Sequence, residues 1–282
     1  MNRYLELTKP RITLFILMST GIGFMFGTHL GRPWTWMELF HTLLGTLLIA
    51  AGTAALNQWY ERDGDGLMNR TKARPIPSGR ITADHALLFG TALSAAGFIE
   101  LCAGVNILTG LLALFTLASY LFVYTPLKRV SPVSTTIGAI PGAMPPLIGY
   151  AAASGHLKYE AGILFAILFL WQIPHFYAIA WMYREDYARA GIRMLPVVEP
   201  TVDSTARRIV WFSMALVPMS LAPKFFDMAG NLYLFGASIL GTIVLYAGFQ
   251  ANSNQTRVQA RRVLLASVLY LPLLYGLMAL DS

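Results

Sequence analysis

The feature that most constrains the fold of this chain is a series of long apolar runs separated by short polar segments. Of its 282 residues, 56% are apolar and only 12% are charged, whereas about 25% of a soluble domain is charged. Several runs reach the roughly 20 residues that a helix needs to span a bilayer. We therefore expect an all-α, polytopic integral membrane protein with a single transmembrane domain over residues 1–282.

Charge clusters and Pro/Gly positions divide these runs into nine predicted transmembrane helices around a central cavity. Their expected ranges are 12–30, 37–60, 84–105, 107–125, 133–153, 159–182, 208–226, 230–250 and 263–280. The connection at Val105 and Asn106 is very short, which predicts that the third and fourth helices form an antiparallel hairpin. Glycines and prolines between Gly138 and Pro146 predict breaks in the fifth helix, and such backbone is tolerated where it lines a cavity or packs on neighbours.

Lysines and arginines are distributed very unevenly among the predicted loops. With the N-terminus inside, 18 of the 21 basic residues fall in inside loops, and only Arg32, Lys158 and Lys224 fall outside. The positive-inside rule therefore places the N-terminus in the cytoplasm. The net charge of +7 marks the cytoplasmic face and gives no reason to invoke a nucleic-acid partner.

The N-terminal segment predicts a retained membrane helix. No small-residue cleavage site follows the first apolar run, so we do not expect a signal peptide. The chain also lacks an amphipathic transit sequence rich in Arg and Ser, which favours a bacterial plasma membrane over an organelle. Cys102 is the only cysteine, so internal disulfides, Cys-rich zinc sites and Fe–S clusters are excluded.

The most concentrated polar stretch follows the second apolar run. Asn57, Glu61 and Asp65 lie four residues apart, so they share one face if the helix is continuous. Gly64 and Gly66 weaken the helix there, and we expect Asp65 on the first turn of the loop. Such oxygen ligands suit Mg²⁺, which takes one or two carboxylates and completes its shell with water and substrate phosphate.

Cations follow in the same loop and again after the fourth helix. They are Arg70, Lys72, Arg74, Lys128 and Arg129. Together with the acids they suggest a metal-bridged diphosphate at the mouth of a membrane helix. The alternative is an ordinary interfacial loop whose solvated charges only orient the helices. Asn57 weighs against that alternative, because it lies inside the apolar run and its side chain needs a partner there.

A second polar group lies on the sixth helix and in the loop that follows it. Gln172 and His175 interrupt an otherwise apolar helix, and intramembrane polar residues are usually functional. His175 could bind a metal or haem iron, act as a base, or hydrogen-bond a carbonyl. Four nearby aromatic residues could line an isoprenoid pocket or simply pack at helical spacing. They are Trp171, Phe176, Tyr177 and Trp181.

The loops at about 61–83 and 183–207 are separated by an even number of predicted helices. They therefore open on the same side of the membrane, where they could face one another across a single cavity. Both carry acids beside cations, and Glu185 and Asp186 supply the acids of the second loop.

These motifs resemble the UbiA superfamily of intramembrane prenyltransferases, whose signature is Asn-x3-Asp/Glu-x3-Asp, here Asn57, Glu61 and Asp65. Within that superfamily the chain resembles the protohaem IX farnesyltransferases, also called haem O synthases. The segments that carry this resemblance are 65–75, 124–129, 137–149, 171–176 and 184–196. The signature alone indicates only the superfamily, and the later segments are much more specific.

The resemblance implies transfer of a farnesyl group from farnesyl diphosphate to a vinyl group of haem B, with water addition and diphosphate release, to give haem O. It implies Mg²⁺ as cofactor, held by the catalytic residues Asn57, Glu61, Asp65 and Asp186. The implied substrate-binding residues are Arg70, Lys72, Arg74, Tyr124, Lys128, Arg129, Trp171, His175, Arg184 and Tyr187. Among these, His175 is the candidate contact for haem. Beyond the lipid bilayer, a haem A synthase or a terminal oxidase assembly is a candidate partner.

The chain departs from the wider superfamily at one place. Other members carry a second Asp-x3-Asp motif, and Tyr183 and Tyr187 occupy the corresponding positions here. Only Asp186, with Glu185 beside it, offers a carboxylate there. This departure fits the haem-using branch better than the branch that prenylates aromatic acids.

Three other functions stay open on the residues alone. The first is a sister enzyme that prenylates an aromatic acid, a quinone precursor or a chlorophyllide. The second is a transporter with a midplane site at broken helices, although no inverted repeat is evident. The third is a non-catalytic factor that delivers haem to an oxidase. Such a factor would need His175 but not Glu61, Asp65 or Arg70.

Overall fold

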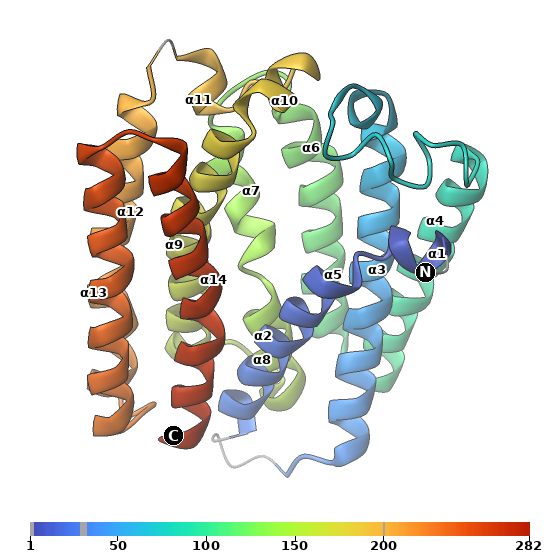
Figure 1. The fold of residues 1–282 in the computed structure, drawn as a ribbon. Coiled ribbons are helices and arrows are strands. Elements are labelled where there is room, and N and C mark those ends of the chain that lie inside the picture. The colour runs from blue at the N-terminus through green and yellow to red at the C-terminus, as the bar shows by residue number, and fades with distance from the viewer. Residues whose placement is uncertain (1–2, 29–32, 200) are drawn as a thin grey trace.

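The computed structural model describes residues 3–28, 33–199 and 201–282, and within these ranges it contains helices and no strands. The long helices stand side by side as one bundle, with α12 to α14 grouped at one flank (Figure 1). In chain order the elements are α1 (Arg3–Leu7), α2 (Pro10–Thr28), α3 (Trp36–Leu67), α4 (Ala83–Gly104), α5 (Ile107–Ala118), the π-helix η1 (Ser119–Tyr124), α6 (Thr125–Leu127), α7 (Ser134–Gly142), α8 (Pro145–Ser154), α9 (Tyr159–Met182), α10 (Arg184–Arg189), α11 (Leu195–Val198), α12 (Asp203–Phe225), α13 (Asn231–Ser253) and α14 (Arg257–Leu280). The expected all-α fold is confirmed.

Seven spans in the described ranges are long and apolar enough to cross a membrane. They are α2, α3, α4, the continuous segment Ile107–Leu127, α9, α13 and α14. The two other spans expected from the sequence correspond to the α7–α8 pair and to α12. The count of nine and the cytoplasmic N-terminus stay predictions, and Arg32, one of the three expected outside cations, lies outside the described residues.

The expected break in the fifth span is present between α7 and α8, at Ala143 and Met144. Gln172 of α9 holds this region, because its Nε2 atom donates to the carbonyl oxygens of Ala139 at 3.4 Å and Leu168 at 3.1 Å. The second half, α8, packs closely along α2. A Cβ atom at Gly149 would lie 1.8 Å from the Thr20 carbonyl oxygen, so only glycine permits this approach.

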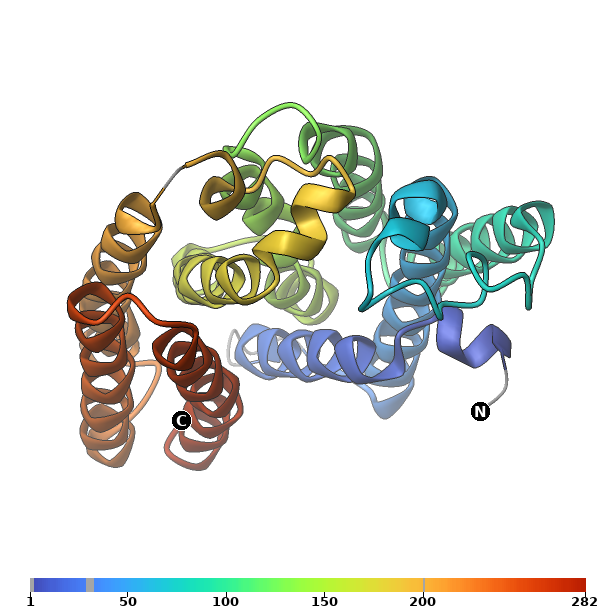
Figure 2. The same ribbon diagram turned by 45° about the horizontal axis from the view of Figure 1, so that its top comes forward.

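The two long polar loops meet at one end of the bundle, which we call the loop end. There α10 and α11 lie across the ends of α7 and α9 (Figure 2). Met68, Ala190, Ile192 and Met194 pack in one buried apolar cluster, which joins the end of α3 to the second loop. The backbone N–H of Arg193 also donates to the Lys128 carbonyl oxygen at 2.7 Å. The prediction that the loops face one another is therefore confirmed.

One helix boundary differs from its prediction in a way that affects the site. The second span was expected to end near residue 60, with Asp65 on a loop turn, but α3 continues to Leu67. The two glycines do not end the helix, since Thr71 and the cluster around Met68 hold its last turn in place. Asp65 consequently keeps the helical register of Asn57 and Glu61.

Candidate functional site

A cavity of about 400 Å³ opens at the loop end, between α2, α3, the α5–η1–α6 segment, α9 and the second loop. Such a volume lies near the lower end of the range for ligand pockets, roughly 300–1,000 Å³. Its polar lining includes Glu6, Lys9, Asn57, Gln58, Glu61, Asp65, Arg70, Arg74, Tyr120, Tyr124, Lys128, Thr135 and Tyr187. Its apolar lining consists of Ile12, Met68, Phe176, Ile179, Ile192 and Met194.

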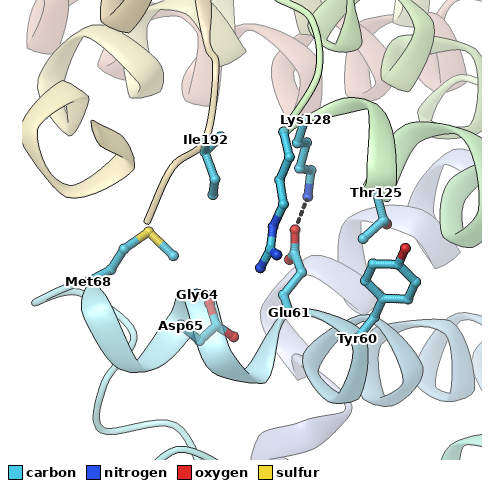
Figure 3. Close-up of a pocket in the computed structure, with 9 residues that line it drawn as sticks. Tyr60, Glu61, Gly64, Asp65, Met68, Thr125, Lys128 and Ile192 are labelled. Carbon is cyan, nitrogen blue, oxygen red and sulfur yellow. Dashed lines mark hydrogen bonds and ion pairs between the residues drawn. The ribbon is translucent and has the colours of Figure 1, made fainter. Parts of the chain in front are cut away.

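Two stripes of polar residues face each other across this cavity. Asn57, Glu61 and Asp65 form the stripe on α3. The opposite stripe is Tyr120, Tyr124 and Lys128, also spaced by four residues. The Nζ atom of Lys128 donates to Glu61 Oε1 at 2.8 Å (Figure 3), and Asn57 Nδ2 donates to Thr125 Oγ1 at 3.4 Å. The cation and the carboxylate from the two stripes thus form one bonded unit.

Lys128 is buried and surrounded by groups that favour its charge. Its Nζ atom lies 4.2 Å from the ring centroid of Tyr124 and 5.8 Å from that of Tyr120. Burial by itself disfavours the ammonium, but the Glu61 carboxylate holds the pKa of Lys128 well above its usual range. Gly138 leaves the space for the Tyr124 ring, because a Cβ atom there would lie 2.4 Å from it. The surroundings of Lys128 therefore favour its charged form in the cavity wall.

Asp65 is the most deeply buried acid of the site, with 1% of its surface exposed. Arg74 NH1 donates to Asp65 Oδ2 at 2.6 Å. The second carboxylate oxygen, Oδ1, is buried and has no hydrogen-bond partner among the described residues. An unpartnered buried carboxylate oxygen is costly unless another ligand satisfies it. Asp65 therefore has one oxygen engaged by a cation and one available to a metal ion.

Lys9 adds a basic side chain that, in the sequence, is one of the inside-loop basic residues. It lies between α1 and α2 with a left-handed backbone, φ 48°, and its Nζ atom donates to Asn57 Oδ1 at 3.1 Å. Burial and the nearby charge of Arg74 lower the pKa of Lys9 to about 7. The segment is held by Arg80, which pairs with Glu6 at 2.7 Å, and by Gln58, which donates to the Leu7 carbonyl oxygen at 2.9 Å.

The second loop is tied to the first by Asp186 and Tyr187. Asp186 Oδ2 accepts from the backbone N–H of Arg70 at 3.2 Å, and Oδ1 is bonded to Arg189. The Arg70 side chain donates to the Tyr187 hydroxyl at 3.3 Å and lies 5.2 Å from the Tyr183 ring centroid. Asp186 does not line the cavity. Its geometry gives it a tethering function, and its role as a metal ligand stays a prediction.

The structure brings some of the other predicted residues to the cavity and leaves some outside it. Arg129 lines a smaller pocket beside Glu61 and Gly64, and Lys72 and Arg184 are exposed at the loop end. Among the described residues no group of three or more His, Cys, Asp and Glu side chains is arranged to hold a metal ion. Asp186 is consequently not grouped with Glu61 and Asp65.

The aromatic residues of α9 have different surroundings from one another. Phe176 lines the cavity, whereas Tyr177 and Trp181 are buried in an apolar cluster with residues of α12 and α14. Trp171 and His175 lie against α14. The packing interpretation is therefore confirmed for Tyr177 and Trp181.

Sequence reasoning missed Lys9, Tyr120, Thr125 and the methionine pair Met68 and Met194. Three of them lie near predicted residues: Tyr120 is four residues before Tyr124, Thr125 follows Tyr124, and Met68 is three residues after Asp65. Lys9 and Met194 reach the site through contacts distant in sequence.

The comparison with known families decides what kind of protein has this cavity. Residues 16–271 match the UbiA prenyltransferase family. The chain belongs to this family. It is similar over its whole length to proteins named protoheme IX farnesyltransferase: 61% identical to that of Solibacter usitatus, covering 100% of this chain and 99% of the relative. The corresponding protein of Koribacter versatilis is 46% identical, covering 99% of this chain and 92% of the relative.

Solved structures of the UbiA family share the fold. A structure described for digeranylgeranylglyceryl phosphate synthase has a TM-score of 0.81 at 18% identity, covering 99% of this chain and 97% of that one. A UbiA homolog from Archaeoglobus fulgidus, bound to DMAPP and Mg²⁺, has a TM-score of 0.71 at 21% identity, covering 99% of each chain. With its apolar helices and this family membership, the protein is a multi-pass membrane protein of the UbiA fold.

Proposed function

We propose that this UbiA-family protein transfers a farnesyl group from farnesyl diphosphate to a vinyl group of haem B and produces haem O. The observation that carries the proposal is the 61% identity, over the full chain, to a protein named protoheme IX farnesyltransferase. The cavity supports it, because its mouth is basic and its deeper wall contains Phe176 and Ile179. We further propose that residues 1–282 form one catalytic domain whose cavity opens to the cytoplasm of a bacterial plasma membrane.

The diphosphate is bound by the cations at the mouth of the cavity. Lys128, Arg74, Arg70 and Lys9 line it, and Arg129 lies in the adjoining pocket. Their charges stabilise the negative charge that grows on the diphosphate as its bond to the allylic carbon breaks, and preorganised charge contributes most at such a step. Because these cations are already held by hydrogen bonds, little reorganisation is required.

Residues of α3 have the chemistry to hold Mg²⁺. Asn57, Glu61 and Asp65 offer an amide and two carboxylates on one helical face, and the unpartnered Oδ1 atom of Asp65 fits a hard cation. When bound, Mg²⁺ would supply further positive charge to the diphosphate oxygens that the basic side chains leave free. Two carboxylates match its usual use of one or two protein ligands, with water and substrate phosphate completing the shell.

The remaining steps depend on an apolar surface. The allylic cation must meet the vinyl group before it meets water, and Phe176, Ile179 and Met194 provide a wall that excludes water. The new carbon–carbon bond forms at the terminal vinyl carbon. Water then adds to the cation beside the porphyrin ring and loses a proton, which gives the hydroxyethylfarnesyl group.

The proposal is tested with membranes that contain the protein, supplied with haem B, farnesyl diphosphate and Mg²⁺. We expect a new, more hydrophobic haem on chromatography, absent without farnesyl diphosphate, absent with EDTA and restored by excess Mg²⁺. Transfer of the farnesyl group to an aromatic acid instead would support a prenyltransferase function but contradict haem B as the acceptor. No transfer to any acceptor would contradict the enzymatic proposal and favour a transporter or a haem-delivery protein.

A further inference from the structure

Arg80 lies in the loop between α3 and α4, outside the cavity lining, yet its side chain has several partners. Its Nη1 and Nη2 atoms donate to the two carboxylate oxygens of Glu6 at 2.7 and 3.0 Å, which makes a bidentate pair. Nη2 also donates to the Ala73 carbonyl oxygen, and Nε donates to Ser78 Oγ at 3.0 Å. We call these four residues the Arg80 clamp. It joins α1 to the first polar loop.

The alternative for Arg80 is an ordinary surface ion pair, because 42% of its side chain is exposed. Isolated exposed pairs contribute little, whereas bidentate pairs within a hydrogen-bond network hold a defined geometry. Three of the guanidinium nitrogens donate here, and Arg3 Nη1 donates from α1 to the Arg80 carbonyl oxygen at 2.9 Å. The contacts therefore favour a fixed connection between the two segments.

One end of the clamp holds the segment that carries Lys9. The backbone N–H of Lys9 donates to the Glu6 carbonyl oxygen at 3.3 Å, and the φ angle of Lys9 is 48°. A non-glycine residue keeps such a left-handed backbone only where its surroundings hold it. The pair between Glu6 and Arg80 supplies part of that support. It therefore helps to fix the position from which Lys9 reaches Asn57 Oδ1.

The other end of the clamp holds the backbone on both sides of Arg74. The Ala73 carbonyl group, which accepts from Arg80, belongs to the peptide bond that precedes Arg74. Ser78 Oγ accepts from Arg80 and donates to the Arg74 carbonyl oxygen at 2.7 Å, in the peptide bond that follows. The Arg74 side chain then reaches Asp65 at 2.6 Å. One guanidinium is thus bonded, directly or through a hydroxyl, to both peptide groups of this cavity residue.

We infer that Arg80 is a positioning residue that holds Lys9 and Arg74 in place for the diphosphate. It acts on the first through Glu6 and on the second through the loop backbone. The inference rests on the proposed function, because it takes these two basic side chains as ligands of the diphosphate. It deepens that function by assigning their placement to a residue outside the cavity lining.

The test is binding of farnesyl thiodiphosphate, a slowly reacting analogue of farnesyl diphosphate, measured by calorimetry on the purified protein with Mg²⁺ and without haem. Arg80→Gln loses the bidentate pair and should bind the analogue about tenfold more weakly, as expected for one lost charge-assisted contact. The KM for farnesyl diphosphate should rise by the same factor, while kcat and the KM for haem B stay unchanged. Arg257→Gln removes an exposed arginine at the start of α14 and is the control, which should bind as the wild type does.

Glu6→Gln separates positioning from an effect of charge alone. Glu6 is an acid in the cavity lining, so removing its charge would strengthen diphosphate binding if only Coulomb attraction mattered. If Glu6 instead holds Lys9 in place, the same substitution should weaken binding severalfold. The double variant Glu6→Gln/Arg80→Gln should bind no more weakly than Arg80→Gln, since both substitutions break one contact.

The outcomes separate this inference from the function on which it rests. Tighter binding by Glu6→Gln, or wild-type binding by Arg80→Gln, would overturn the inference even if the wild type produced haem O. The expected order of affinities in a protein that forms no haem product would support the positioning role and contradict haem B as the acceptor. A wild type that does not bind the analogue would overturn both.

Discussion

The Nζ atom of Lys128 donates a hydrogen bond to Glu61 Oε1 across 2.8 Å, and it joins two helices at the mouth of the cavity. Asp65 is paired with Arg74 in the same way, at 2.6 Å. Asn57, the third polar residue of the α3 stripe, accepts from Lys9 at 3.1 Å. Every metal-ligand candidate on α3 therefore has its own cation, and each cation comes from a different segment. These pairs hold the three cations in place at the mouth of the cavity before any substrate binds.

Asp65→Asn tests the metal site directly. The substitution removes the charge but keeps the size of the side chain, so we expect turnover to fall at least about a hundredfold with the same amount of membrane-inserted protein. Haem products and membrane-inserted protein are measured in the same membranes. The matched control is Asp63→Asn, because the Asp63 side chain is 84% exposed and pairs only with Arg62 at 3.9 Å. Wild-type turnover in Asp65→Asn would remove the metal role of this residue.

Lys128→Met tests whether the buried ion pair has a catalytic role in addition to a structural one. Removing Lys128 leaves the partly buried Glu61 carboxylate without its hydrogen-bonded cation, which should cost about 3 kcal/mol of stability and lower the Tm in detergent. The double variant Glu61→Gln/Lys128→Met should recover most of that Tm, since no uncompensated charge remains. It should nevertheless stay inactive. If the double variant recovered activity together with stability, Lys128 would not bind the diphosphate.

Lys9→Gln tests a cation that only the structure revealed. The variant loses one charge-assisted contact to the diphosphate, so the KM for farnesyl diphosphate should rise about tenfold. Lys9→Arg, which keeps the charge, should be affected less. Steady-state kinetics at saturating haem give both values. Arg11→Gln provides the control, because Arg11 is exposed two residues away in the chain. Equal effects of Lys9→Gln and Arg11→Gln would indicate a general effect of surface charge.

Asp186→Asn distinguishes a tether from a metal ligand. In the structure both carboxylate oxygens contact the loops, one through the Arg70 backbone and one through Arg189. If Asp186 only ties the two loops together, Asp186→Asn and Arg189→Gln should both lower kcat and speed proteolysis of the second loop. Neither variant should then change the Mg²⁺ concentration that gives the half-maximal rate. A marked rise in that concentration for Asp186→Asn alone would instead support the metal role expected from the family resemblance.

The parts of the site predicted correctly from the sequence depend on short-range order. Asn57, Glu61 and Asp65 share a face because they are four residues apart on one helix. Residues 159–182 were predicted as a helix with its observed ends, because Lys158 and Tyr183 bound a continuous apolar run. The sequence predicts that this helix ends near residue 60, but α3 continues to Leu67. Tertiary contacts of Met68 override the weak helix propensity of Gly64 and Gly66.

Other parts depend on contacts between distant residues. Asp186 and Asp65 looked equivalent as acids beside cations, yet the structure directs Asp186 to the Arg70 backbone and leaves one oxygen of Asp65 unpartnered. His175 could have been a base, a ligand or a packing residue. The structure places its Nδ1 atom 2.9 Å from the Oγ atom of Ser267, which lies 92 residues away in the chain.

The sequence by itself determined the membrane-embedded helical architecture, the acids and amide of α3, and the family to which the chain belongs, because apolar length and helical spacing are local properties. Only the tertiary structure decided which cation meets which oxygen, that Lys9 enters the site, and that His175 lies against Ser267 of α14. The pairs that settle these points are 48, 67 and 92 residues apart. No local pattern encodes such pairings, since they form only when the helices pack around one cavity.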